Sequence, residues 1–369
     1  MSRRLLLLNG LAILGVILFH AAGWGFTAMF SWTHRYLPVA SPNFDQAGSA
    51  AYYALRLFEQ LCAFSIVAFL FVSGNFAAFS FRREEGGGRW RIVLSRLATL
   101  IVPYLVWSAA LLVSLWLQGR ALSLGDAAEM LLTGSVNPAY YFVPLLIQLY
   151  LLAPLLTSAA KSRPVLLLVV TGVFQLLVYL LQYPLAIGSG LPLVGELGRL
   201  LPKWFFPVRI FWFSFGIVAG LHIGRLKEFV LRWKWALLGA TIVLFAVGVF
   251  EWEALLRASG QPWIDNRETL VDGLYAGAVV LSFLALAEPS RFPSRALGTL
   301  GALSFGIYLV HSPVMEFLAR GLYHLAPWAL SQQMLLVLAL SLAGLGLPVL
   351  LIYAVKRTPL RRLYPYLFG

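Results

Sequence analysis

The sequence is poor in charged residues and holds almost no cysteine. Only 12% of its 369 residues are Asp, Glu, Lys or Arg, whereas 60% are hydrophobic. A water-soluble domain is roughly half apolar and about a quarter charged, so an ordinary soluble protein is excluded, as are disordered, collagen-like and coiled-coil chains. The single cysteine, Cys62, excludes an internal disulfide and a cysteine-rich metal site. The sequence also lacks a Walker loop, a Rossmann glycine motif, HExxH and G-x-S-x-G.

Long apolar runs fill most of the chain. A bilayer core about 30 Å thick is spanned by roughly 20 apolar helical residues. The runs predict an all-α fold, a polytopic bundle of about ten transmembrane helices that forms one domain over residues 1–369, and we expect no appended soluble domain. The eighth run is the weakest because Asp272 and Gly273 interrupt it, and the longest outer loop is expected at residues 27–60. The runs lie near 5–26, 61–81, 93–117, 139–160, 165–188, 204–224, 233–252, 269–287, 299–320 and 333–355.

Basic residues are distributed unevenly over the segments between these runs. If the N-terminus lies inside, most of the 28 Lys and Arg residues fall on the inner side. Cytoplasmic loops are enriched in Lys and Arg, so the asymmetry predicts that both termini are cytoplasmic. Topology therefore explains the net charge of +13 better than nucleic-acid binding does. The N-terminus also resembles a signal peptide, but its long apolar run with a histidine near the end favours a retained first helix.

Polar side chains inside the apolar runs mark the places where chemistry is expected, because each ionisable group costs a few kcal/mol to insert. His20 lies in the outer half of the first run, and Asn9 lies on the same face about 16 Å away. The alternative for His20 is a hydrogen bond to a backbone carbonyl. The ninth run carries a polar stripe at helical spacing, which predicts either a cavity lining or a polar helix–helix contact. The stripe consists of Ser304, Tyr308, His311, Ser312 and Glu316.

Four further polar residues lie in other apolar runs. Ser73 and Asn75 flank Gly74 in the second run, where close helix packing is the alternative explanation. Gln148 lies deep in the fourth run. Arg209 lies near the outer end of the sixth run, where it is expected either to snorkel to the surface or to bind an anion.

The inner loop between the second and third runs is rich in arginine. A guanidinium group binds phosphate through bidentate hydrogen bonds, so the loop is a candidate dock for a phosphate-bearing donor. Topology and anionic lipid headgroups are the alternative explanation. The loop contains Arg82, Arg83, Arg89, Arg91 and Arg96.

Five stretches together resemble acyltransferase family 3 of integral membrane proteins: NGLAILGVILFH, FLFVSGNFAAF, RLATLIVPYLVW, YYFVPLLIQLYLLAPLL and LGALSFGIYLVHSP. Members of this family move acyl groups, commonly acetyl, from cytoplasmic acyl-CoA to hydroxyls of surface glycans, lipids or other exported molecules. The resemblance places His20 at the essential histidine of the family. Three positions depart from the family pattern: Asn9 replaces an arginine, Asn75 an aromatic residue and Leu100 a basic residue.

The resemblance implies an O-acyltransferase of the cell membrane that uses acyl-CoA, most simply acetyl-CoA, and no metal. The implied partners are a glycan or lipid-linked acceptor and the bilayer, without nucleic acid; acceptor, acyl length and oligomeric state are left open. The alternatives are a transporter or flippase, and a non-catalytic family member. The expected catalytic residues are His20, Tyr308 and His311, and the expected substrate-binding residues are Asn9, Ser73, Asn75, Arg82, Arg83, Arg89, Arg96, Gln148, Arg209, Ser304 and Glu316.

Overall fold

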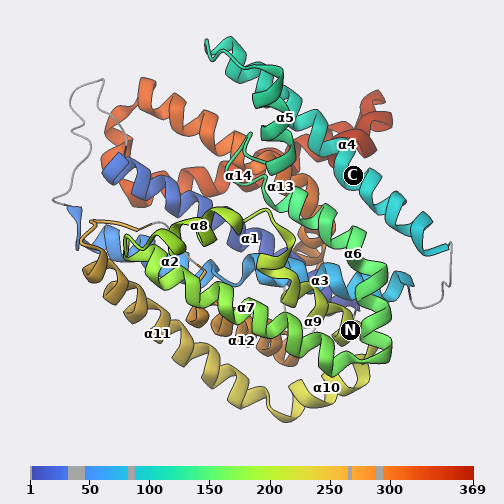
Figure 1. Cartoon of the computed structure of the whole chain (residues 1–369). Coiled ribbons are helices and arrows are strands. Elements are labelled where there is room, and N and C mark those ends of the chain that lie inside the picture. Colours follow the sequence, from blue (N-terminus) through green and yellow to red (C-terminus); the bar gives the residue numbers. More distant parts are fainter. Residues whose placement is uncertain (1, 32–45, 82–87, 265–267, 288–293) are drawn as a thin grey trace.

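The computed structural model of the chain describes residues 2–31, 46–81, 88–264, 268–287 and 294–369, and over these ranges it is helical without a strand (Figure 1). Each predicted apolar run coincides with a helix or a pair of helices. The long helices are α1 (Ser2–Phe26), α3 (Ser65–Phe81), α4 (Gly88–Leu117), α6 (Phe142–Ser162), α7 (Pro164–Ala186), α11 (Lys234–Ser259), α12 (Leu270–Leu286), α13 (Ser294–Leu325) and α14 (Gln333–Arg357). The shorter ones are α2 (Ala50–Cys62), α5 (Leu124–Thr133), α8 (Pro192–Leu200), α9 (Ile210–Leu221), α10 (Ile223–Arg232) and α15 (Tyr364–Phe368).

The length and hydropathy of the helices confirm a polytopic membrane protein. Within the described ranges, 8 spans are long and apolar enough to cross a bilayer, with α2 and α3 counted together. The number is 9 if the bent pair, which comprises residues 206–221 and helix α10, is counted as one broken span. Helix α12 is apolar but shorter, and with it the bundle agrees with the predicted ten helices.

The structure corrects two details of the sequence prediction. Asp272 does not interrupt the eighth helix but starts it, because Asp272 forms a reciprocal capping box with Thr269. Part of the predicted 27–60 loop is the amphipathic helix α2, whose N-cap is Ser49. Residues 32–45 of that loop lie outside the described ranges. Both corrections concern polar residues at helix starts, where a capping side chain and a loop side chain look alike in sequence.

Two backbone-to-backbone crossings hold the centre of the bundle together. Helices α1 and α13 meet at Gly10 and Gly301, where a Cβ atom would collide with a carbonyl oxygen of the partner helix. Helices α3 and α9 meet in the same way at Gly74 and Gly216. Small residues at such crossings let membrane helices approach closely. Helices α1, α3 and α13 are mostly buried, whereas α7 and α11 expose most of their apolar side chains to the surroundings.

The two termini lie at the same end of the bundle. Arg3 donates a hydrogen bond to Ser294 at the start of α13, so the N-terminal turn lies beside that start. At the other terminus, Gly369 contacts Thr99 in the first half of α4. Figure 1 shows both terminus labels toward the right of the view. We call this end the inner end, following the charge asymmetry, and the opposite end the outer end.

Candidate functional site

A cavity of about 340 Å³ lies between α1, α3, α4, α6, α13 and α15. Five of the residues singled out in the sequence line it: Asn9, Ser73, Arg96, Ser304 and Tyr308. They come from four different helices, so the fold assembles polar groups that are far apart in the chain. Among the described lining residues Arg96 is the one cation, and both Arg96 and Thr99 are exposed at the surface.

The crossing of α1 and α13 places Asn9 beside Ser304. The Asn9 Nδ2 group donates to Ser304 Oγ at 2.9 Å and to the Gly301 carbonyl oxygen at 3.3 Å. The close approach at Gly10 and Gly301 makes these short bonds possible. The position that carries an arginine in the family pattern is therefore occupied here by a neutral amide that is bonded to the opposite helix.

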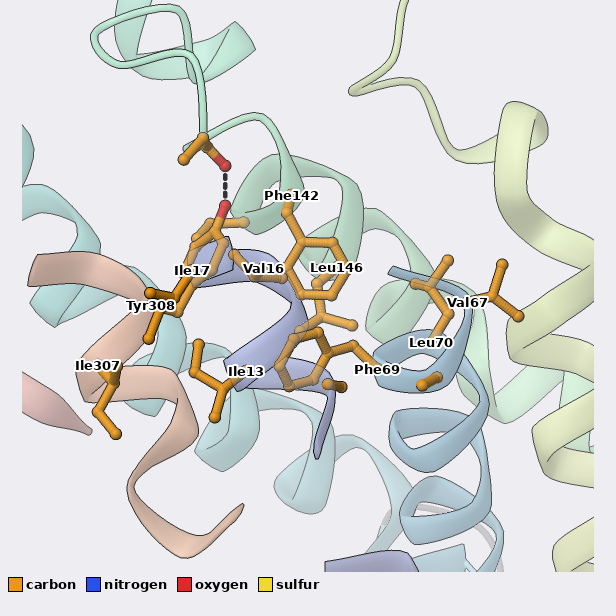
Figure 2. Packing of buried hydrophobic residues seen from close by; sticks show 14 of the residues in the cluster. Ile13, Val16, Ile17, Val67, Phe69, Leu70, Phe142, Leu146, Ile307 and Tyr308 are labelled. Atoms are coloured by element: carbon orange, nitrogen blue, oxygen red, sulfur yellow. Dashed lines mark hydrogen bonds between the residues drawn. The ribbon is translucent and has the colours of Figure 1, made fainter. Parts of the chain in front are cut away.

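Much of the remaining cavity wall is apolar. Phe69, Phe142 and Leu146 contribute side chains from α3 and α6, and Figure 2 shows them close to Tyr308. Ile13 and Val16, which lie between Asn9 and His20 on α1, are buried in this core. Along α13, Tyr308 is the lining residue nearest the outer end. An apolar chain of modest length fits such a wall better than a highly charged molecule does.

Two histidines lie one turn beyond Tyr308 toward the outer end. The ring centroids of His20 and His311 are 5.2 Å apart, and His20 is half-buried whereas His311 is fully buried. His311 Nδ1 lies 2.6 Å from the Tyr308 carbonyl oxygen. A carbonyl oxygen only accepts, so the Nδ1 atom carries the proton of the neutral ring. This leaves Nε2 with a free lone pair, and Nε2 is buried without a hydrogen-bond partner among the described residues.

A loop that sequence reasoning missed surrounds this turn of α13. Ser312 Oγ donates to Asn137 Oδ1 at 2.7 Å, and the Tyr308 hydroxyl donates to the Ala139 carbonyl oxygen. Tyr140 donates in turn to the Leu309 carbonyl oxygen at 2.5 Å. Figure 2 shows the bond from Tyr308 to this loop as a dashed line. In sequence Asn137 precedes Pro138 and is typical of a turn, so no signal distinguished it.

The other predicted residues lie outside the cavity lining. Gln148 bonds Trp204 and Phe206 backbone atoms, at 2.9 and 3.2 Å, and so holds the segment before α9. Arg209 is buried and forms an ion pair with Glu268, and Glu316 pairs with Arg320 at 2.6 Å. Asn75 is fully buried at the α3–α9 crossing. Arg89 lies in the first turn of α4 without lining the cavity, and Arg82 and Arg83 lie outside the described residues.

Comparison with protein families decides what kind of protein carries this site. The family model for acyltransferase family 3, described as an acyltransferase domain, matches residues 5–353. The chain belongs to acyltransferase family 3. The match spans nearly the whole chain and confirms the resemblance drawn from the five sequence stretches. A search of curated proteins and a search of solved structures found no match.

Family membership supports acyltransferase activity in a membrane protein. In this acyltransferase family 3 protein, the histidine expected from the family pattern is His20, and the structure places it beside His311 and close to the cavity. No group of three or more His, Cys, Asp or Glu side chains capable of holding a metal ion occurs among the described residues. The chemistry available at the site is that of two imidazoles next to a largely apolar cavity.

Proposed function

We propose that the protein transfers a short acyl group, most simply acetyl, from acyl-CoA at the inner end to a hydroxyl of an exported glycan or glycolipid. We also propose that this transfer takes place in the cell membrane. The observation that carries the proposal is the line from the exposed Arg96 through the cavity to Tyr308 and on to the pair of His20 and His311.

The chemistry of acyl-CoA fits this arrangement. Its charge lies on phosphates at one end, and its thioester lies at the far end of a flexible, uncharged arm. Arg96 can pair with phosphate at the mouth, while the apolar wall formed by Phe69, Phe142 and Leu146 accepts the arm and a short acyl group. Asn9 and Ser304 supply neutral hydrogen-bonding groups along the way. The remaining arginines of the inner loop extend the same electrostatic attraction for phosphates.

The proposed reaction uses neutral His20 as the base. It takes the proton of the acceptor hydroxyl as the oxygen attacks the thioester carbonyl; the carbon–sulfur bond then breaks, and the departing thiolate receives that proton. The products are the ester of the acceptor and free coenzyme A. Imidazole suits this role because its ordinary pKa lies near neutrality. A covalent acyl-histidine formed before the acceptor arrives is the alternative order of the same bond changes.

His311, Tyr308 and Asn137 are assigned to positioning in this proposal. The Tyr308 hydroxyl already donates to Ala139, so its proton is engaged, and Asn137 fixes the neighbouring turn through Ser312. These bonds hold the backbone on both sides of His311 and thereby the ring that contacts His20.

The test is thiol release from acetyl-CoA by the full chain in nanodiscs, with and without a membrane glycan extract. Wild type is compared with His20→Ala and with the control His324→Ala, which changes an exposed histidine near the end of helix α13. We expect release in the wild type and control, stimulation by the extract, and loss in His20→Ala.

Three other outcomes would reject the proposal. Equal release by wild type and His20→Ala would show that any hydrolysis is unrelated to this site. Absence of binding and release with acetyl-CoA and with longer acyl-CoAs would favour a non-catalytic family member. Flux of an unmodified substrate into proteoliposomes would identify a transporter.

A further inference from the structure

Helix α10 leaves the bundle at a steep angle. Only His222 separates it from α9, and the two helices are bent by 101° relative to each other. Figure 1 shows α10 between α9 and α11, lying across the end of the bundle. We call residues 223–235 the elbow. Spanning helices tilt by only about 20° on average from the bilayer normal. A helix nearly perpendicular to a span therefore lies close to the plane of the membrane surface.

The two sides of α10 differ in chemistry. Val230 is fully buried and Leu226 is partly buried against the core, so these two residues, one turn apart, dock the helix onto the bundle. Phe229 and Trp233 are about half exposed, at 48% and 49%. A short helix with an apolar docking side, exposed aromatic residues and a charged side is typical of helices that lie in the membrane interface.

The cations of this elbow form no ion pair with any residue that the structure describes. Arg225, Lys227 and Arg232 belong to α10 and Lys234 begins α11, and none forms an ion pair with a described residue. The acid of α10, Glu228, stands at helical spacing from two of these arginines and still pairs with neither. At the outer end the corresponding spacings do form pairs: Arg199–Glu196, Arg257–Glu253 and Arg320–Glu316.

Aromatic rings accompany the unpaired cations. The Arg232 guanidinium lies 5.9 Å from the Trp233 ring centroid, and the Lys234 ammonium lies 5.3 Å from that of Trp235. Trp235 is 68% exposed. Tryptophan concentrates at the headgroup level of bilayers, and clustered Lys and Arg beside it attract anionic lipid. The elbow combines both features over a few residues.

The elbow is separate from the proposed donor site. None of the described residues of α10 lines the cavity, whose cation Arg96 belongs to α4. The cations of α10 are therefore not placed to hold the phosphates of a donor whose arm enters that cavity. The phosphate groups within their reach are those of the lipid headgroups at the membrane surface on which the helix lies.

We propose that α10 and the first residues of α11 form a binding site for anionic phospholipid headgroups of the inner leaflet. Arg225, Lys227, Arg232 and Lys234 contact the lipid phosphates, while Trp233 and Trp235 lie at headgroup depth. This binding holds the inner end of α9 at the membrane surface. Because α9 packs backbone to backbone on α3, and α3 forms one wall of the cavity, the lipid steadies that wall.

The test measures retention of phosphatidylglycerol and of phosphatidylcholine by the purified full chain, using native mass spectrometry and lipid titration. The variant is R225Q/K227Q/R232Q/K234Q. The matched control, K161Q/R163Q/R361Q/R362Q, removes four exposed cations from other inner segments. We expect wild type and control to prefer phosphatidylglycerol, and the α10 variant to lose at least about tenfold of that preference.

Folding of the variant is checked by its thermal transition in phosphatidylcholine. If the fourfold variant does not fold, R225Q/K227Q and R232Q/K234Q are measured separately, each with an expected loss of about threefold. Unchanged phosphatidylglycerol binding by the variants, or an equal loss in the control, overturns the proposal. Displacement of the bound lipid by excess coenzyme A also overturns it, because the elbow would then be a donor surface.

Discussion

Two polar clusters in the outer half of the bundle differ in whether their hydrogen bonds are complete. The first, which we call the cap cluster, consists of Gln60, Tyr183, Glu251, Thr269 and Asp272. Tyr183 and Thr269 each donate to Glu251 at 2.5 Å, and Gln60 donates to Asp272 at 3.0 Å. None of these side chains has a buried atom without a partner.

The second cluster, around His20 and His311, contains a buried polar atom whose hydrogen bonding is not satisfied by any residue that the structure describes. Its supporting groups Asn137, Ser312 and Tyr308 are bonded, but His311 Nε2 is buried and unpartnered among the described residues. Buried polar groups in proteins are nearly always satisfied, so an exception asks for an explanation. The comparison suggests that a saturated cluster serves the fold, whereas an unsaturated one, next to a cavity, serves chemistry.

The sharpest test of this comparison is the separation of activity from stability at His20. We expect His20→Ala to lower the transfer rate by about 10²- to 10⁴-fold, the usual contribution of a general base. The thermal unfolding midpoint should remain close to that of wild type, because His20 is only half-buried. Both are measured on the same nanodisc preparation. A large drop in the midpoint would place His20 with the structural residues instead.

The opposite pattern is expected in the cap cluster. Thr269→Val removes the N-cap hydroxyl of α12, which leaves Glu251 with one donor fewer and the Asp272 backbone N–H without its acceptor. The expected loss is about 2–3 kcal/mol in the free energy of unfolding, from the lost cap and the hydrogen bond lost at Glu251. Chemical denaturation in detergent measures it. The rate per folded molecule should not change; Thr241→Val, which removes a mid-helix hydroxyl of α11, is the control.

Asn137 lies between these extremes, because its hydrogen bond supports the histidine turn without being part of it. Asn137→Ala is expected to lower kcat by about tenfold with little change in KM for acyl-CoA, since a displaced catalytic group affects the chemical step. Ser312→Ala removes the other partner of the same bond, so the double variant should lose little more than either single one. Additive losses would show that the two residues act independently.

The sequence predicted the fold well because its signals are local. Apolar runs of spanning length are read directly from the chain and predicted the helices. Gly74, between Ser73 and Asn75, indicated close helix packing as one of two explanations, and the α3–α9 crossing lies there. The polar stripe of the ninth run was only partly informative: Ser304 and Tyr308 line the cavity, whereas Glu316 pairs with Arg320. Helical spacing gives the face of a residue but not its depth or its neighbour.

For the same reason, the sequence does not predict which residue on another helix a polar side chain pairs with. The sequence left two interpretations of Arg209, snorkelling and binding an anion. In the structure its partner is Glu268, a residue 59 positions away. Asn137 reaches Ser312 over 175 positions. Such pairings are set by how ten helices pack around one another, which no periodicity within a single helix contains.

The smallest effect is expected at Arg96, which is exposed at the mouth of the cavity and forms no ion pair with a described residue, in contrast to the buried, ion-paired Arg209. Arg96→Gln should raise KM for acyl-CoA about threefold to fivefold without changing kcat, because an exposed charge contact contributes up to about 1 kcal/mol. The effect should shrink as salt rises, since exposed charges are screened. Arg163→Gln, an exposed inner cation away from the cavity, is the matched control. A change in kcat instead of KM would mean that Arg96 reaches past the mouth toward the reacting groups.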